Sequence, residues 1–198
     1  MLGCSEGLAI RWMNANSAEP PAYQEAAAEQ RAGPMADRLI VGVLGNRNAG
    51  KSLTWNTLFG RTVKTGRDER RLWLSETEWV TVFLVSGSPE ERQQYVGDII
   101  TAQAPRIVLC SLQYRSDVTE TIDYFAERDY QFYIHWLNPG FRDGRQYPDS
   151  LELLPDLLQH ESLVGIRSGR VDPAERVAEL RDLIFGWANS RGLVHSEA

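Results

Sequence analysis

Short apolar runs alternate along the chain with segments whose apolar residues recur at helical spacing. The run at 39–44, LIVGVL, is continuously apolar, as strands buried on both faces of a parallel sheet are. In segment 116–129, Val118, Ile122 and Phe125 recur on one face of a helix. Strands and helices that alternate in this way predict an α/β fold with a mostly parallel central sheet.

The same pattern assigns elements to most of the chain beyond residue 38. Further strands are expected at 70–74, 79–85, 106–112, 131–137 and 162–166. Helices are expected at 52–60, 88–103, 116–129, 150–160 and 172–188. Ser88 and Asp172 are expected N-caps, because each precedes a proline at the first helical position. The strands at 70–74 and 79–85 are expected to form one antiparallel hairpin beside the parallel strands.

The first part of the chain, residues 1–36, differs from the rest in composition. It is rich in Ala, Glu, Gln and Pro and poor in branched apolar residues, so it is expected to be a disordered tail. Met35 is a candidate start codon, which would make the earlier residues an upstream extension. Residues 37–198 are expected to form a single domain, because they show no internal repeat and no second pattern of elements.

Composition narrows the class of protein. The net charge of -6 argues against a general nucleic-acid binder, which usually carries a basic face. Cys4 and Cys110 form neither a disulfide framework nor a metal-ligand spacing. No window approaches the ~20 apolar residues of a membrane span, and the first residues lack the basic and apolar parts of a signal peptide. We therefore expect a cytoplasmic protein without a membrane partner.

The stretch GNRNAGKS at 45–52 matches the phosphate-loop pattern GxxxxGK[ST]. A strand precedes it and a helix follows it, as this pattern requires. In such a turn, backbone N–H groups and the N-terminus of the helix bind phosphate oxygens. Lys51 is expected to bind the β- and γ-phosphates of a nucleoside triphosphate, and the Ser52 hydroxyl to bind Mg²⁺ as the cofactor. The expected nucleotide contacts are Gly45, Asn46, Arg47, Asn48, Ala49, Gly50, Lys51, Ser52 and Leu53.

The longer stretch GNRNAGKSLTWNTLFG at 45–60 resembles the first motif of the Era-like and tRNA-modification GTPases, which is roughly GxxNxGKSxxxNxLxG. The residues that extend the match beyond the phosphate loop are Asn48, Asn56, Leu58 and Gly60. The resemblance implies that residues 37–198 form a three-layer α/β/α P-loop NTPase domain of the GTPase-like kind.

The resemblance also implies roles for residues farther along the chain. Thr65 corresponds to the switch threonine that binds Mg²⁺ and senses the γ-phosphate. Gly87 corresponds to the glycine of the DxxG motif, whose N–H binds the γ-phosphate. Asn138 corresponds to the asparagine of the base-reading NKxD motif. Lys51, Thr65 and Gly87 are therefore the expected catalytic residues, and Ser52 and Thr65 are the expected metal ligands.

Two motifs of that family are incomplete in this chain. The strand at 79–85 is followed by Ser86, whereas the family has an aspartate there that holds the Mg²⁺ shell. Metal binding is then either weaker or completed by another acid, for which the candidates are Glu90, Glu91 and Asp98. Pro139 stands where NKxD has its lysine, and the aspartate of that motif is absent. A preference for GTP or for ATP therefore stays open.

Together these features predict a protein that binds a nucleoside triphosphate with Mg²⁺ and hydrolyses it slowly, since no residue is visible that would position the attacking water. Such a protein would act as a nucleotide-dependent switch. Binding of a protein partner is as compatible with these features as catalysis is. A pseudo-NTPase that serves as an interaction module is a further alternative.

A small P-loop kinase is the second interpretation. Segment 106–139 resembles the part of zeta-toxin-like and polynucleotide-type kinases in which a strand, an xRxD helix and another strand follow one another. Arg142 and Arg145 would then lie in a lid over the phosphate that is transferred to a nucleotide, a nucleic-acid end or a small molecule. The missing catalytic aspartate counts against this interpretation, because a kinase needs a group that accepts the proton of the substrate hydroxyl.

The other polar residues have sufficient structural interpretations. His135 lies near the end of a predicted strand, where open α/β sheets bind ligands, but a lone histidine there favours a structural role. The charged run at 61–71 is interpreted as a solvated loop, so binding of nucleic acid is not favoured. Glu90 and Glu91 fit the first turn of a helix through its dipole, which leaves a general-base role as an alternative.

Overall fold

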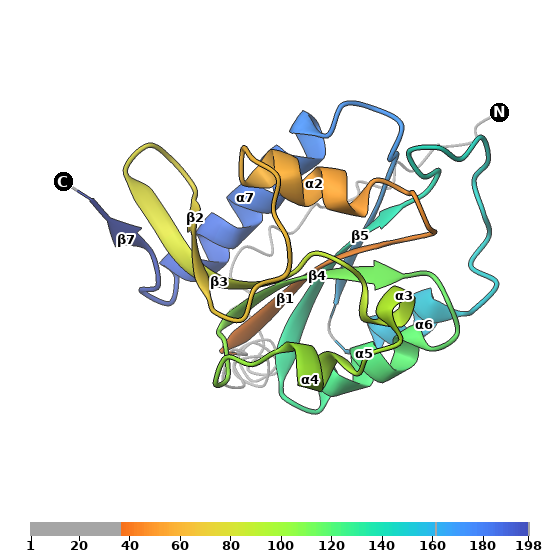
Figure 1. Ribbon diagram of the computed structural model, residues 1–198, viewed down its shortest axis with the longest axis horizontal. Helices are drawn as coiled ribbons and strands as arrows, with labels where there is room; N and C mark the ends of the chain where they lie inside the picture. The colour runs from red at the N-terminus through yellow and green to blue at the C-terminus, as the bar shows by residue number, and fades with distance from the viewer. Residues whose placement is uncertain (1–36, 161, 198) are drawn as a thin grey trace, which may run out of the picture. The chain divides into compact units, whose positions relative to one another are not determined.

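The computed structural model describes residues 37–160 and 162–197 (Figure 1). Their fold is α/β, with a mixed, mostly parallel sheet of seven strands and with six helices, which confirms the predicted fold class at this level. The expected tail at 1–36, Met35 and Cys4 lie outside the described residues. In the part of the chain that is described, none of the helices has the length and apolar character needed to span a bilayer.

Six strands of the sheet follow the order β2-β3-β4-β1-β5-β6. The strands are β1 (Arg38–Gly45), β2 (Arg70–Trp73), β3 (Glu78–Val85), β4 (Ile107–Gln113), β5 (Tyr130–Leu137), β6 (Leu163–Arg167) and β7 (His195–Ser196). The neighbours from β3 to β6 pair in parallel, and β2 pairs with β3 as the predicted antiparallel hairpin. Strand β7, a second antiparallel neighbour of β3, was not expected from the sequence, because its two residues are exposed and carry no apolar pattern.

The helices are α2 (Lys51–Leu58), α3 (Pro89–Arg92), α4 (Val96–Ile99), α5 (Val118–Ala126), α6 (Leu153–Leu158) and α7 (Ala174–Asn189). The single helix expected at 88–103 is wrong, although Ser88 and Pro89 begin a helix as expected. Gln93 takes a left-handed φ of 53° and Tyr95 is extended, so the segment breaks into two helices of one turn each. The N-cap of α7 is Pro173, one residue after the expected Asp172, although Oδ1 of Asp172 accepts a hydrogen bond of 2.8 Å from the N–H of Ala174.

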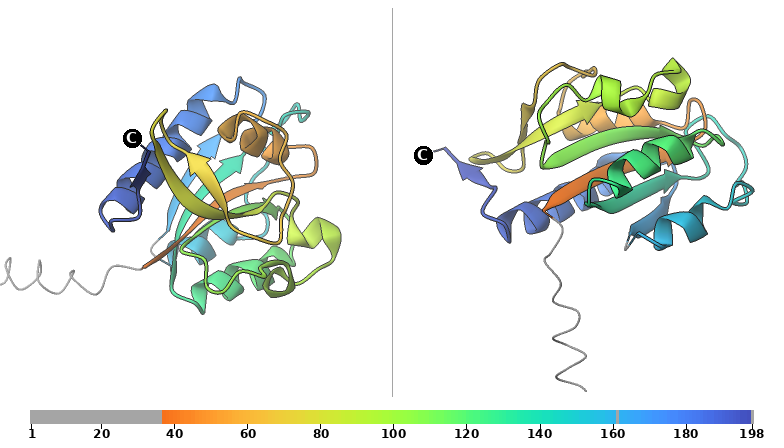
Figure 2. Two further views of the ribbon diagram at one scale, coloured as in Figure 1. Left: turned by 60° about the vertical axis from the view of Figure 1, so that its left-hand side comes forward. Right: turned by 90° about the horizontal axis from the view of Figure 1, so that it is seen from below.

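Helices cover both faces of the sheet (Figures 1 and 2). On one face, α2 and α7 pack with the β1 residues Leu39, Val41 and Val43. On the other face, α4, α5 and α6 pack with Ile40 and Leu44. Both faces of β1 are therefore buried, which is the physical reason for the uninterrupted apolar run that marks this strand in the sequence.

The order of the strands places the topological switch point of the sheet at β1. Although β4 and β5 are consecutive strands, they pair with opposite edges of β1. In open α/β sheets, ligands bind outside the carboxyl ends of the strands at such a switch point. The segments that follow β1, β4 and β5 are the ones that meet there.

Candidate functional site

The loop between β1 and α2 has two residues with positive φ, an asparagine and a glycine. Asn48 has a φ of 63° and Gly50 a φ of 102°, both in the left-handed region that these two residue types tolerate best. The N–H of Ala49 donates to the carbonyl of Asn46 over 3.1 Å, and α2 begins directly after Gly50. The residues that define the sequence pattern are thus those that the turn requires.

Two other segments fix this loop from outside. The N–H of Phe141 donates to the carbonyl of Ala49 over 2.9 Å, and the N–H of Gly169 donates to the carbonyl of Pro139 over 2.7 Å. A Cβ at Gly140 would lie 2.8 Å from the Cα of Ala49, and one at Gly169 would collide with the Ala49 carbonyl oxygen. The segments after β5 and β6 therefore hold the loop in one conformation through contacts that leave no room for a side chain.

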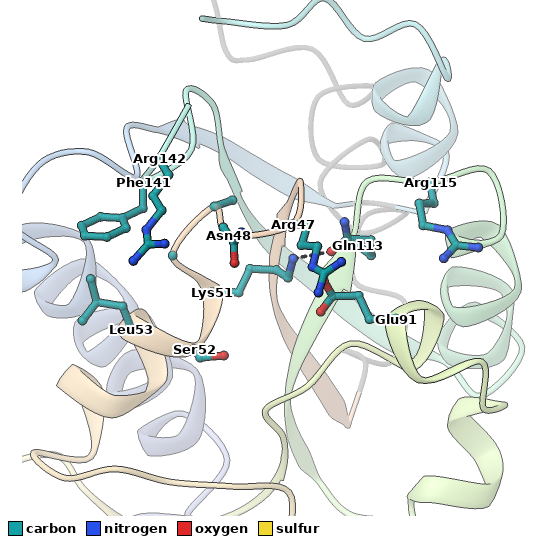
Figure 3. Close-up of a pocket in the computed structure, with 12 residues that line it drawn as sticks. Arg47, Asn48, Lys51, Ser52, Leu53, Glu91, Gln113, Arg115, Phe141 and Arg142 are labelled. Atoms are coloured by element: carbon teal, nitrogen blue, oxygen red, sulfur yellow. Dashed lines mark hydrogen bonds between the residues drawn. The ribbon is translucent and has the colours of Figure 1, made fainter. Parts of the chain in front are cut away.

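A cavity of about 770 Å³ lies over the loop (Figure 3), within the range of small-molecule sites. Its lining combines a continuous stretch, residues 47–53, with residues from α3, from the end of β4 and from the segment after β5. These distant residues are Glu91, Gln113, Arg115, Phe141 and Arg142. Of the expected nucleotide contacts, Gly45 and Asn46 do not line the cavity.

The lining is strongly cationic. Among the described residues that line the cavity, Arg47, Lys51, Arg115 and Arg142 are positive and Glu91 is negative. Within the described part of the chain, Arg47 and Arg142 form no hydrogen bond and no ion pair. Positive side chains that converge without partners repel one another, and an anionic ligand relieves this repulsion. The cavity therefore suits a polyanion.

Lys51 lies at the base of this cavity with 6% of its surface exposed. Its ammonium donates to the carbonyls of Gly45 and Asn46, each over 3.0 Å, and to Oε1 of Gln113 over 2.5 Å. Burial lowers the pKa of this ammonium, while the carboxylates of Glu91 and Glu90 act in the opposite direction. All three acceptors are neutral, so the charge of Lys51 has no direct counter-ion in the described residues.

Gln113 is a functional candidate that was not expected from the sequence. It ends β4 directly opposite Gly45, and its side chain is buried against Lys51. Its N–H donates to the carboxylate of Glu90 over 2.9 Å, and that carboxylate accepts a second bond of 2.6 Å from the Thr121 hydroxyl. Burial raises the pKa of Glu90, and these two hydrogen bonds oppose the rise. A polar residue at the end of a buried apolar strand was the available signal.

Thr65 and Gly87 come together in the structure, but away from the cavity. Thr65 Oγ1 accepts hydrogen bonds of 3.0 Å from the N–H of Ser86 and from Nη2 of Arg92. The same guanidinium covers Gly87, where a Cβ would lie 2.7 Å from Nη2. Neither residue lines the cavity, whereas Ser52 is exposed and does. Because β4 lies between β1 and β3, the residues that follow β3 are one strand removed from the loop.

Asn138 also lies outside the lining. It is 7% exposed. Its side-chain NH₂ donates to the carbonyl of Tyr147 over 2.7 Å, and its Oδ1 accepts a hydrogen bond of 2.9 Å from the N–H of Tyr147. It therefore closes the loop after β5. Arg142 of that loop reaches the cavity and Arg145 does not. Phe141, which is 45% exposed, lines the cavity on the same side as Leu53 (Figure 3).

Of the three acidic residues considered for metal binding, one lines the cavity and two do not. Glu91 lines the cavity and accepts a hydrogen bond of 3.0 Å from the Ser88 hydroxyl. Glu90 is buried in the network described above, and Asp98 lies on α4 outside the lining. Across residues 37–160 and 162–197, no three His, Cys, Asp or Glu side chains form a group that could hold a metal ion.

His135 and Cys110 are structural in position. His135 is fully buried on β5, outside the cavity lining, and its Nε2 lies 3.1 Å from the Tyr133 hydroxyl. Burial lowers its pKa to about 4. The Cys110 thiol is buried in β4, where burial raises its pKa well above the ordinary value, so it is an unreactive core group.

Comparison with known proteins gives no relative of this chain, since no family model, no characterised protein and no solved structure matches it.

Proposed function

We propose that the chain binds a nucleoside triphosphate with Mg²⁺ through the loop at 47–52 and hydrolyses it slowly, as a nucleotide-dependent switch on a P-loop NTPase domain of three layers. One observation carries the proposal. A glycine-containing loop leads from a buried strand into α2 and forms the floor of a cationic cavity, where the buried ammonium of Lys51 meets only neutral acceptors among the described residues. This combination of charge and backbone suits the phosphates of a nucleotide.

The phosphates would lie across the loop. The N-terminus of α2, a helix of eight residues, adds its positive dipole end to the N–H groups of the loop. Lys51 would exchange part of its bonds to neutral acceptors for bonds to the β- and γ-phosphates. Charge-assisted hydrogen bonds of this kind are about twice as strong as neutral ones, so the exchange favours binding.

The base would stack on Phe141. This side chain and Leu53 form the apolar side of the cavity. Every base has a π face, so stacking on an aromatic ring contributes about 1–3 kcal/mol without selecting a sequence of bases. Asn138 is engaged with Tyr147 and is not free to read the base. We therefore propose that GTP and ATP bind with similar affinity.

Mg²⁺ would be held mainly by the phosphate oxygens of the nucleotide, with Ser52 as the protein ligand. Ser52 presents an exposed hydroxyl in the first turn of α2, whereas the hydroxyl of Thr65 is engaged by Ser86 and Arg92 outside the cavity. Magnesium usually keeps several waters and shares phosphate oxygens with the protein. Ser52 would hold the ion, which would reduce the negative charge of the triphosphate. We expect no measurable binding of Mg²⁺ without nucleotide.

The γ-phosphate would lie beside Lys51 and Gln113, which gives the switch a physical basis. The backbone of Gln113 is bonded to Glu90 of α3, and Glu90 is bonded to Thr121 of α5. A ligand that displaces Gln113 from Lys51 would therefore act on two surface helices. NTP and NDP would differ in this effect, because the NDP lacks the group that reaches Gln113.

The test is equilibrium binding of GTP and ATP to the full chain, with Mg²⁺ and with EDTA. We expect Mg²⁺-dependent binding that weakens by about 100-fold in Lys51→Ala, because charged hydrogen bonds are lost. Lys64→Ala is the matched control, since Lys64 is exposed and lies outside the cavity lining. Equal affinity in both variants, or no binding of either nucleotide at millimolar concentration, would contradict the proposal.

A further inference from the structure

The cavity extends beyond the place proposed for the γ-phosphate. Glu91, Gln113 and Arg115 form an end that lies across Lys51 from Phe141 and Leu53 (Figure 3). We call these three residues the acceptor end. In phosphoryl transfer the attacking and leaving oxygens lie roughly in line on opposite sides of the phosphorus. If the base stacks on Phe141, the attacking group enters from the acceptor end.

Arg115 gives this end a guanidinium that contacts two neighbouring residues. Its Nη2 lies 2.9 Å from Oδ2 of Asp117, and its Nη1 donates to the carbonyl of Glu90 over 3.3 Å. The side chain remains 48% exposed, and a half-exposed pair with Asp117 has little strength in water. A guanidinium held in one orientation matches the oxygens of a phosphate group.

Gln113 adds a hydrogen-bond donor that lines the cavity. The residue is 6% exposed and its Oε1 is engaged by Lys51, but its side-chain NH₂ donates to no other described residue. This side chain lines the cavity, so its free donor can reach a ligand oxygen. A charged ligand oxygen would give this donor a stronger hydrogen bond than a neutral partner does.

Glu91 supplies the proton acceptor that a kinase needs and that the sequence motifs did not provide. Its carboxylate lines the cavity, is positioned by the Ser88 hydroxyl and lies close enough to Lys51 to affect its pKa. A carboxylate at this position can accept the proton of an attacking hydroxyl group.

We propose that the acceptor end binds a second substrate, a small hydroxyl compound that carries a phosphate group, and that this compound accepts the γ-phosphoryl group. The inference rests on the proposed binding of the triphosphate. The hydroxyl oxygen forms a bond to the γ-phosphorus while the bond from that phosphorus to the β–γ bridging oxygen breaks. The nucleoside diphosphate leaves, and the hydroxyl proton goes to the carboxylate of Glu91. Arg115 and the NH₂ of Gln113 hold the phosphate group of the acceptor.

The experiment begins with the full chain saturated with Mg²⁺ and a β,γ-imido triphosphate analogue, which occupies the γ-phosphate position. Glycerol 3-phosphate is then titrated by calorimetry, with glycerol as the uncharged match. We expect saturable binding of glycerol 3-phosphate and none of glycerol. Arg115→Ala should weaken this binding by more than about tenfold, and Arg145→Ala should leave it unchanged, because Arg145 is exposed and outside the cavity lining.

The outcomes separate the two proposals. If the analogue itself does not bind, the proposed function fails. If the analogue binds but glycerol 3-phosphate does not saturate up to about 10 mM, or if Arg115→Ala binds it as well as wild type does, only the acceptor end is wrong.

The role of Glu91 is tested separately through hydrolysis, in which water takes the place of the hydroxyl compound. Glu91→Gln should keep the affinities for the analogue and for glycerol 3-phosphate but slow phosphate release by about 100-fold, as the loss of a general base does. Equal rates in the two proteins, or no phosphate release by wild type, would overturn the assignment of Glu91 as the proton acceptor.

Discussion

At the scale of single residues, the proposed function depends most on Lys51. Its ammonium is buried among neutral acceptors, and burial lowers its pKa. A buried charge without a direct counter-ion costs stability, and the phosphates of the proposed ligand would offset that cost. Residues of this kind are those at which stability and function make opposite demands.

His135 is a second residue whose pKa is lowered by burial, and it lies outside the cavity lining. Burial is the main cause that lowers its pKa from 6.5 to about 4, with Arg167 and Arg176 acting in the same direction and Glu179 against them. The unfolded chain therefore binds a proton at this residue at a higher pH than the folded chain does. As the pH falls from 6.5 to 4, the free energy of unfolding should fall by about 2–3 kcal/mol through this residue.

The measurement is urea unfolding of wild type and His135→Leu between pH 7.5 and 4. We expect the variant to lose less stability than wild type across this window, since it has no imidazole to protonate. Parallel curves for the two proteins would show that His135 is protonated equally in the folded and unfolded states, which would contradict the lowered pKa.

The candidate site could be predicted from sequence only where it is local. The loop residues and Ser52 follow from a pattern of adjacent positions, and although Gly45 and Asn46 do not line the cavity, residues 47–53 of the expected stretch do. Gln113, Arg115 and Phe141 join them because β4 and β5 flank β1, and strand order is not written in any short stretch of the chain. For the same reason, Thr65 and Gly87, which were expected from the resemblance to the GTPase family, do not line the cavity.

At the scale of elements, the phosphate loop depends on the segments after β5 and β6. Gly169 passes so close to the Ala49 carbonyl that a Cβ would collide with it, and the bond from the Gly169 N–H to Pro139 fixes the approach. We expect Gly169→Ala to displace the loop, to weaken nucleotide binding by at least about tenfold and to lower stability by about 1–3 kcal/mol, as overpacking does. Titration with nucleotide and urea unfolding measure the two effects.

Gly144→Ala is the control for that substitution. Gly144 lies in the loop that follows β5, and a Cβ there would meet nothing within 4 Å. Its stability should stay within about 0.5 kcal/mol of wild type, with unchanged nucleotide affinity. If the two variants behave alike, the close contact at Gly169 does not position the loop.

Among the elements, the buried strands were predictable, whereas the exposed strand β7 and the short helices α3 and α4 were not. Strands buried on both faces must be apolar throughout, so β1, β4 and β5 appear directly in the sequence. The segment after Ser88 has good capping and composition for one long helix, yet the left-handed φ at Gln93 divides it. Packing of α3 against β4 and of α4 against α5 outweighs local preference there, and no short stretch of sequence indicates such tertiary contacts.

At the scale of the whole described domain, the order of the strands decides what faces the loop. With β4 between β1 and β3, Ser86 and Gly87, which directly follow β3, lie outside the cavity lining, although Glu91 farther along that segment lines it. This order of strands brings the end of β4 into the lining instead. In the proposed nucleotide site, the γ-phosphate would therefore contact Gln113 and not a residue that directly follows β3.

The most direct test of the central claim locates the nucleotide on the chain. Uniformly ¹⁵N-labelled protein would be titrated with Mg²⁺ and a β,γ-imido triphosphate analogue while backbone amide resonances are followed by NMR. We predict saturable shifts concentrated at residues 46–53 and at Gln113, and their absence in Lys51→Ala. Saturable shifts elsewhere on the molecule, with residues 46–53 unchanged, would contradict the claim that this loop holds the phosphates.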